Sequence, residues 1–175
     1  MSSLYAPVNI HWTKDGRFVS DIFTVSFFGH KEIDKFQVAE DAVNIIVSEL
    51  IKQKEYVVFL VGREGDSDKI VSTVIKRTQH EITDVNSCHV CVMPYLKKEY
   101  LHHFGTLVRY YDQMQLCKAA ESKFPKAAIQ VRNRNMVARS DLCVFYVADD
   151  QGTAWKTMRY AQKNGKKIIN IPDIY

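Results

Sequence analysis

The feature of this sequence that most constrains its fold is a repeated unit of an apolar strand, a glycine-containing turn and an amphipathic helix. Residues 23–28 form a β-branched and aromatic stretch that stops at Gly29, and residues 56–61 form a continuous apolar stretch that stops at Gly62. Strands that are apolar at nearly every position are typical of a parallel sheet covered on both faces. The repeat therefore predicts an α/β fold in which a parallel sheet of about five strands carries helices on both faces.

The same patterns place the remaining elements. Further strands are expected at about residues 88–93, 141–147 and 167–171, and helices at about residues 34–50, 70–75, 132–139 and 152–164. The first of these helices is expected to begin with a capping box formed by Asp34 and Gln37. Residues 95–128 are less regular, although the spacing from Leu107 to Cys117 suggests another helix.

Length and composition are those of one globular domain. The chain has 175 residues, of which 46 % are hydrophobic and 25 % are charged. We expect residues 1–20 to form an N-terminal arm or a hairpin around Asp15 and Gly16, and residues 21–175 to form a single domain. Because the sequence has neither a membrane-length apolar stretch nor a basic, apolar start, we expect a cytoplasmic protein that does not bind a membrane.

The cysteines do not indicate a metal site or a disulfide. Cys88 and Cys91 have the spacing of a zinc or redox motif, but they fall on a predicted strand, where residues three apart point to opposite faces. No second motif of this kind is present. We therefore expect no bound metal and assign the thiols to the core.

The charge is uneven along the chain. Residues 118–175 contain 11 Lys or Arg against 5 Asp or Glu, whereas residues 1–117 contain 13 against 15. An excess of positive charge in the last third favours an anionic partner such as a nucleotide or a nucleic acid, although the same residues also suit a solvated helix face.

Three turns are expected to meet at one edge of the sheet, because the carboxyl ends of parallel strands share an edge and ligands bind there. These turns contain Gly29 and His30, residues 62–65, and Gly152 and Thr153. Glycines before a helix let backbone amides approach a phosphate. Neither a dinucleotide-binding fingerprint nor a P-loop is present, so an ordinary dehydrogenase and a P-loop NTPase are disfavoured.

The helix at 132–139 adds polar groups near the same edge. The planar guanidinium of Arg132 can donate two hydrogen bonds to a phosphate, and the amide of Asn133 can bind a ribose or the edge of a base. If Val137 packs inward, Asn133 rather than Arg134 lies toward the sheet edge. Each of these residues taken alone is equally compatible with an ordinary helix surface.

Taken in order, several motifs resemble those of the SLOG superfamily, which groups the DprA DNA-processing proteins with the LOG phosphoribohydrolases. The motifs lie at residues 26–33, 59–68, 132–136, 140–141, 152–153, 160–161 and 166–171. Within that superfamily the chain is most similar to the small bacterial YpsA-like proteins. The resemblance implies a Rossmann-like fold that binds a nucleotide or a nucleotide-derived ligand.

The motifs carry a set of expected ligand-binding residues onto this sequence. The set comprises Gly29, His30, Gly62, Arg63, Glu64, Gly65, Asp68, Arg132, Asn133, Met136, Gly152 and Thr153. The sequence departs from the family pattern at Lys31, which replaces an arginine, and at Gln151, which replaces a glycine. A lysine keeps the charge but loses the bidentate fork.

The resemblance favours binding over catalysis. LOG enzymes use a glutamate just after the Gly-Thr turn, and residues 154–157 contain no acid. The leading interpretation is a binding or sensing module for a small nucleotide-derived ligand such as AMP, ADP-ribose or an NAD-like molecule. The alternatives are a nucleoside-monophosphate phosphoribohydrolase, for which Glu64 is the available acid, and a single-stranded DNA-binding protein. No cofactor is certain, and a homo-oligomer remains open.

Overall fold

The structure is a computed structural model that describes residues 12–121 and 123–174. Its centre is a six-stranded, fully parallel sheet with the strand order β4-β3-β2-β1-β5-β6. The strands are β1 (Ile22–Gly29), β2 (Tyr56–Val61), β3 (Ser87–Met93), β4 (Gln113–Leu116), β5 (Leu142–Tyr146) and β6 (Lys167–Asn170). The predicted Rossmann-like fold is confirmed, with six strands in place of about five.

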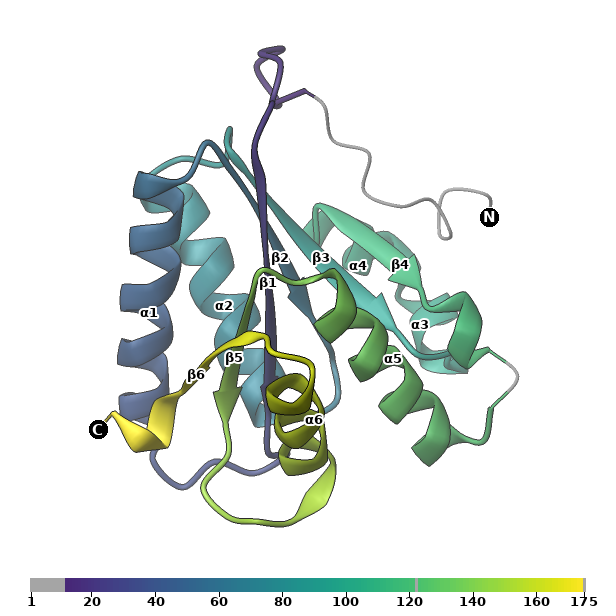
Figure 1. The fold of residues 1–175 in the computed structure, drawn as a ribbon. Coiled ribbons are helices and arrows are strands. Elements are labelled where there is room, and N and C mark those ends of the chain that lie inside the picture. The colour runs from purple at the N-terminus through teal and green to yellow at the C-terminus, as the bar shows by residue number, and fades with distance from the viewer. Residues whose placement is uncertain (1–11, 122, 175) are drawn as a thin grey trace.

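Helices cover both faces of this sheet (Figure 1). They are α1 (Phe36–Gln53), α2 (Asp66–Glu81), α3 (Lys98–His102), α4 (Phe104–Tyr110), α5 (Pro125–Arg139) and α6 (Gly152–Lys163). Helices α1 and α2 pack on one face, and α5 and α6 pack on the other. Short 3₁₀ helices occupy Lys118–Ala120 and Ile171–Asp173.

The apolar strands create one core on each side of the sheet. In β2, Val57, Phe59 and Val61 face α1 and α2, whereas Val58 and Leu60 face α5 and α6. All five side chains are at most 2 % exposed. The period-two alternation of a strand thus explains why every position of β2 had to be apolar.

Three predictions about individual elements were wrong. Residues 113–116 form the edge strand β4 and not part of a helix. Helix α1 begins at Phe36, and neither Asp34 nor Gln37 caps it, since Gln37 donates a hydrogen bond to Asp41 instead. Helix α5 begins at Pro125, seven residues earlier than expected, and proline is favoured in the first turn of a helix.

The structure confirms that Cys88 and Cys91 lie on one strand, β3, and point to opposite faces of the sheet. Cys91 lies in the core beneath α1 and α2, whereas Cys88 lies in the core on the opposite face. All four cysteines are free and buried. Within residues 12–121 and 123–174, no group of three His, Cys, Asp or Glu side chains is placed to hold a metal ion.

No helix in the described part of the chain is both long and apolar enough to cross a membrane.

The N-terminal segment contains the hairpin that the Asp15–Gly16 turn predicts, while residues 1–11 lie outside the described residues. Trp12 pairs with Phe18 in an antiparallel bridge, and Gly16 has a φ of 83° that favours glycine. This hairpin lies at the amino-terminal edge of the sheet, opposite the loops that follow the strands (Figure 1).

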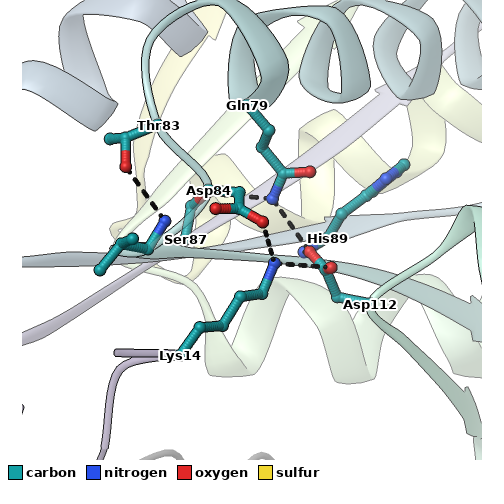
Figure 2. A network of polar contacts seen from close by, with 8 residues as sticks. Lys14, Gln79, Thr83, Asp84, Ser87, His89 and Asp112 are labelled. Atoms are coloured by element: carbon teal, nitrogen blue, oxygen red, sulfur yellow. Dashed lines mark hydrogen bonds and ion pairs between the residues drawn. The ribbon is translucent and has the colours of Figure 1, made fainter. Parts of the chain in front are cut away.

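A polar network ties the hairpin to the sheet. The Asp112 carboxylate accepts hydrogen bonds from the His89 backbone N–H at 2.8 Å, from Gln79 Nε2 at 2.9 Å and from Lys14 Nζ at 3.0 Å. Figure 2 shows Lys14 reaching both Asp112 and Asp84 from the hairpin. These interactions hold the pKa of Asp112 below its usual range, although burial alone would raise it. The network is therefore structural and stands apart from the opposite edge of the sheet.

Candidate functional site

A cavity of about 700 Å³ opens at the carboxyl edge of the sheet. It lies where the strand order reverses, because β1 has β2 on one side and β5 on the other and the chain continues outward from each. Ligands of open α/β sheets bind at such a switch point. The volume is within the range of about 300–1,000 Å³ that is usual for small-molecule sites.

Ten of the twelve predicted ligand-binding residues line this cavity. They are Gly29, His30, Gly62, Glu64, Asp68, Arg132, Asn133, Met136, Gly152 and Thr153. They come from the end of β1 and the loops after β1 and β2, from the first turn of α2, from α5 and from the start of α6. The structure therefore gathers residues separated by more than a hundred positions in the chain.

The other two predicted residues do not line the cavity. Arg63 turns away, with Nη1 3.3 Å from Tyr111 Oη and its guanidinium over the Tyr100 ring. Gly65 packs against the loop after β1, where an added Cβ would lie 2.6 Å from Lys31 Cα. Gly65 thus serves packing between two loops.

Arg132 is the main cationic group inside the cavity. Its side chain projects from α5 and is 4 % exposed, and Nη1 donates a hydrogen bond of 2.8 Å to the Val92 carbonyl. Its Nε is buried without a hydrogen-bond partner, and Arg132 takes part in none of the ion pairs formed by the described residues. The charge of the buried Asp68 carboxylate acts on Arg132, but the two form no ion pair, so an anionic ligand would offset part of the cost of burying the guanidinium.

The turn after β2 is shaped to admit this guanidinium. An added Cβ on Gly62 would lie 2.7 Å from Arg132 Nη1 and 3.0 Å from Asp68 Oδ2, so a larger residue there would force the guanidinium to move. Asp68 Oδ2 accepts the Glu64 backbone N–H at 2.6 Å and so fixes the turn. Burial raises the pKa of Asp68. The charge of Arg132 and the hydrogen bonds from the backbone N–H groups of Glu64 and Gly62 offset only part of that rise.

The start of α6 provides a second group of donors. Gly152, Thr153 and Ala154 line the cavity, and the first turn of this twelve-residue helix contains no acidic residue. Gly152 has a φ of 81°, a conformation that other residues rarely adopt. The first N–H groups of a helix lack intrahelical partners and favour an anion.

Asn133 fixes the distance between α5 and α6. Its Nδ2 donates a hydrogen bond of 3.1 Å to Thr157 Oγ1, and that hydroxyl donates one of 2.8 Å to the Thr153 carbonyl. Of these two neighbouring residues, Asn133 lines the cavity, whereas the Arg134 guanidinium lies over the Tyr160 ring.

Glu64 adds a carboxylate to the lining of the cavity. Its Oε2 lies 3.0 Å from Lys97 Nζ, and its Oε1 is buried without a hydrogen-bond partner. Burial would lower the pKa of Lys97, but the hydrogen bond and charge of Glu64 outweigh it and raise that pKa to about 12. This ion pair therefore stays intact across the physiological pH range.

His30 joins two loops at the rim. Its Nε2 accepts the Ala148 backbone N–H at 3.1 Å and lies 3.6 Å from Asp149 Oδ1. The contact holds the loop after β5 close to the end of β1.

Sequence reasoning missed several cavity residues. They are Phe27, Phe28, Lys97, Pro125, Lys126, Ile129 and Ala154. Lys31, noted in the sequence as the position where a lysine replaces the family's arginine, and Tyr95 line the cavity as well. Tyr95 and Lys97 come from the part of the segment 95–128 to which the sequence assigned no regular structure. Tyr110 and Tyr111 of the same segment do not line the cavity and pack around the buried His89 ring. Pro125 was the available signal for Lys126, because a proline marks the first turn of a helix.

The fold is shared with known structures. Neither a protein-family model nor a curated protein sequence matches the chain. Among solved structures, the chain is similar to DNA processing protein A from Helicobacter pylori, with a TM-score of 0.59 and 19 % identity. That structure was described in a study of how the Helicobacter pylori protein binds single-stranded DNA. It is also similar to DNA processing protein A (DprA) from Streptococcus pneumoniae, with a TM-score of 0.60 and 15 % identity.

The likeness covers 83 % and 84 % of this chain but only 63 % and 49 % of the two DprA chains. At this identity it establishes the fold, which agrees with the resemblance to the SLOG superfamily seen in the motifs. The finer resemblance to YpsA-like proteins stays a prediction.

Proposed function

We propose that this protein binds a phosphate-bearing nucleotide in the cavity at the carboxyl edge of the sheet. The observation that carries this proposal is Arg132, a buried guanidinium that faces the cavity and has neither an ion pair nor a partner for Nε among the described residues. A phosphate would be an ion-pair partner for the Arg132 guanidinium and would accept hydrogen bonds from its coplanar N–H groups.

The surroundings of Arg132 supply further groups that suit an anionic ligand. The amino end of α6 lines the same cavity and offers backbone N–H groups with no acidic side chain in its first turn. Lys31 and Lys126 add positive charge to the lining. The cavity volume of about 700 Å³ leaves room for a sugar and a base beyond the phosphate.

The test compares two arginines of the same helix. Arg132→Met should weaken binding of the nucleotide by about 10- to 150-fold, the loss expected when a hydrogen bond to a charged group is removed. Arg134→Met is the matched control, because Arg134 is exposed and lies over Tyr160 outside the cavity lining. Calorimetric titration with AMP, ADP, ADP-ribose and NAD measures both variants.

Equal affinity of the natural chain and Arg132→Met for a nucleotide that binds would refute the assignment of Arg132. Mass spectrometry of the same mixtures separates a binding module from a phosphoribohydrolase, since only the latter releases free base. Circular dichroism confirms that each variant is folded.

Single-stranded DNA is the second candidate ligand. It is favoured by the shared fold with the Helicobacter pylori protein, whose structural study concerns single-stranded DNA binding. In that case the affinity for an oligodeoxythymidine should fall steeply as salt rises, because counterions are released from the strand. A salt-insensitive or absent response to the oligonucleotide would leave the mononucleotide as the ligand.

A further inference from the structure

Glu64 lines the cavity and has a carboxylate oxygen without a hydrogen-bond partner among the described residues. Glu64 Oε2 is engaged by Lys97 at 3.0 Å, whereas Oε1 is buried and has no partner among the described residues. The Glu64 side chain is only 16 % exposed. A buried carboxylate oxygen that lacks a donor is unfavourable, so this atom is suited to accept a hydrogen bond from a ligand.

The position of Glu64 is fixed before any ligand binds. Its backbone N–H donates to Asp68 Oδ2 at 2.6 Å, and Lys97 holds one oxygen of the side chain. A carboxylate that is held in place loses little conformational entropy when it binds a hydroxyl group. The free oxygen therefore provides selectivity as well as binding energy.

Glu64 lies near the phosphate site defined by Arg132. The point where a Cβ of Gly62 would stand is 2.7 Å from Arg132 Nη1 and 3.0 Å from Asp68 Oδ2, and Asp68 Oδ2 also accepts the Glu64 N–H. The turn that carries Glu64 is thus next to the Arg132 guanidinium. Because Glu64 and Arg132 line the same cavity, a sugar attached to a phosphate on Arg132 would lie in the cavity that the Glu64 side chain lines.

We propose that Glu64 recognises the sugar hydroxyls of the bound nucleotide and so selects a ribonucleotide over a deoxyribonucleotide. A carboxylate accepts hydrogen bonds and cannot donate them, and the hydroxyls of ribose are donors at this position. A 2′-deoxyribose offers one donor fewer. This inference rests on the proposed function, because it takes the phosphate to be bound by Arg132.

The experiment uses sugar phosphates that have no base. Binding of ribose 5-phosphate, 2-deoxyribose 5-phosphate and inorganic phosphate to the full chain is followed by nuclear magnetic resonance titration. We expect ribose 5-phosphate to bind about 10- to 100-fold more tightly than 2-deoxyribose 5-phosphate, the effect of one hydrogen bond to a charged group. Because no base is present, an amino group of a base cannot produce this preference.

Two variants of the same turn isolate the carboxylate. Glu64→Gln should reduce the preference for ribose to less than about threefold, since the amide lacks the charge that strengthens the hydrogen bond. Asp66→Asn is the matched control, because Asp66 pairs with Lys69 on the outside of the turn and does not line the cavity. It should keep the preference of the natural chain.

The outcomes separate this inference from the proposed function. Equal affinity for the two sugar phosphates, with binding still dependent on Arg132, overturns the role of Glu64 and leaves the phosphate site standing. A ribose preference that survives in Glu64→Gln also overturns it. If none of the three phosphates binds, the proposed function and the role of Glu64 both fail.

Discussion

Gly62 provides the sharpest test of how the cavity is built, because a single methyl group there acts directly on Arg132. In Gly62→Ala the new Cβ would stand 2.7 Å from Nη1, 3.2 Å from Nη2 and 3.0 Å from Asp68 Oδ2. Ordinary contacts begin at 3.4 Å, so the guanidinium must retreat by about 0.7 Å. That movement displaces Nη1, which donates the hydrogen bond to the Val92 carbonyl, and changes the orientation of the guanidinium.

The displacement predicts a large effect on binding and a small effect on stability. Loss of one hydrogen bond between the guanidinium and a phosphate should weaken nucleotide binding by about 1.5–3 kcal/mol, or about 10- to 150-fold. A weakened buried hydrogen bond to Val92 should cost about 1 kcal/mol, which lowers the melting temperature by about 2–4 °C. The assays are calorimetric titration and thermal unfolding of the same preparation.

Gly105→Ala is the control substitution. An added Cβ at Gly105, within α4, meets no atom within 4 Å, so this variant should bind as the natural chain does. Because alanine is the better helix former but Gly105 lies in the first turn of α4, the stability of the variant should rise by no more than about 0.5 kcal/mol. The reasoning is refuted if Gly62→Ala binds a nucleotide ligand of the natural chain with unchanged affinity, since Arg132 would then not need the space above Gly62.

Two further predictions concern the rest of the molecule. Asp112→Asn should lower the free energy of unfolding at pH 7 by about 1.5–3 kcal/mol, measured by urea denaturation. Because the folded pKa of Asp112 is lowered, its contribution is present above the unfolded pKa of about 3.9 and disappears as the pH falls through the folded value. The two chains should therefore converge at low pH, and a constant difference from pH 7 to pH 3 would contradict this. Burial raises the pKa of Cys88 and Cys91 to about 12, so a disulfide reagent should modify them only as fast as the protein unfolds. Rapid labelling of Cys88 or Cys91 in native buffer would contradict this prediction.

The strands of the buried sheet could be predicted because burial on both faces leaves a distinct sequence pattern. β2 and β5 are apolar throughout, and their ends are marked by turn residues. The edge strand β4 could not, because Gln113 and Gln115 alternate with apolar residues over only four positions. The apolar spacing of the preceding α4 continues into it, which produced the false prediction of a longer helix.

The candidate site could be predicted in part for a similar reason. Glycine turns after strands indicate one edge of the sheet, and the order of the motifs identified Arg132 and Asn133. The direction in which Arg63 points could not be read, because it depends on Tyr100 and Tyr111 from a segment whose fold was not predicted. Lys97 was missed for the same reason, since its place beside Glu64 depends on tertiary packing.

The measurement that tests the central claim most directly is a crystal structure of the protein grown with saturating ribose 5-phosphate. The account predicts phosphate oxygens within hydrogen-bonding distance of the Arg132 guanidinium and of the backbone N–H groups at the start of α6. A sugar phosphate bound elsewhere on the molecule, with the Arg132 guanidinium still lacking an anion, would contradict it.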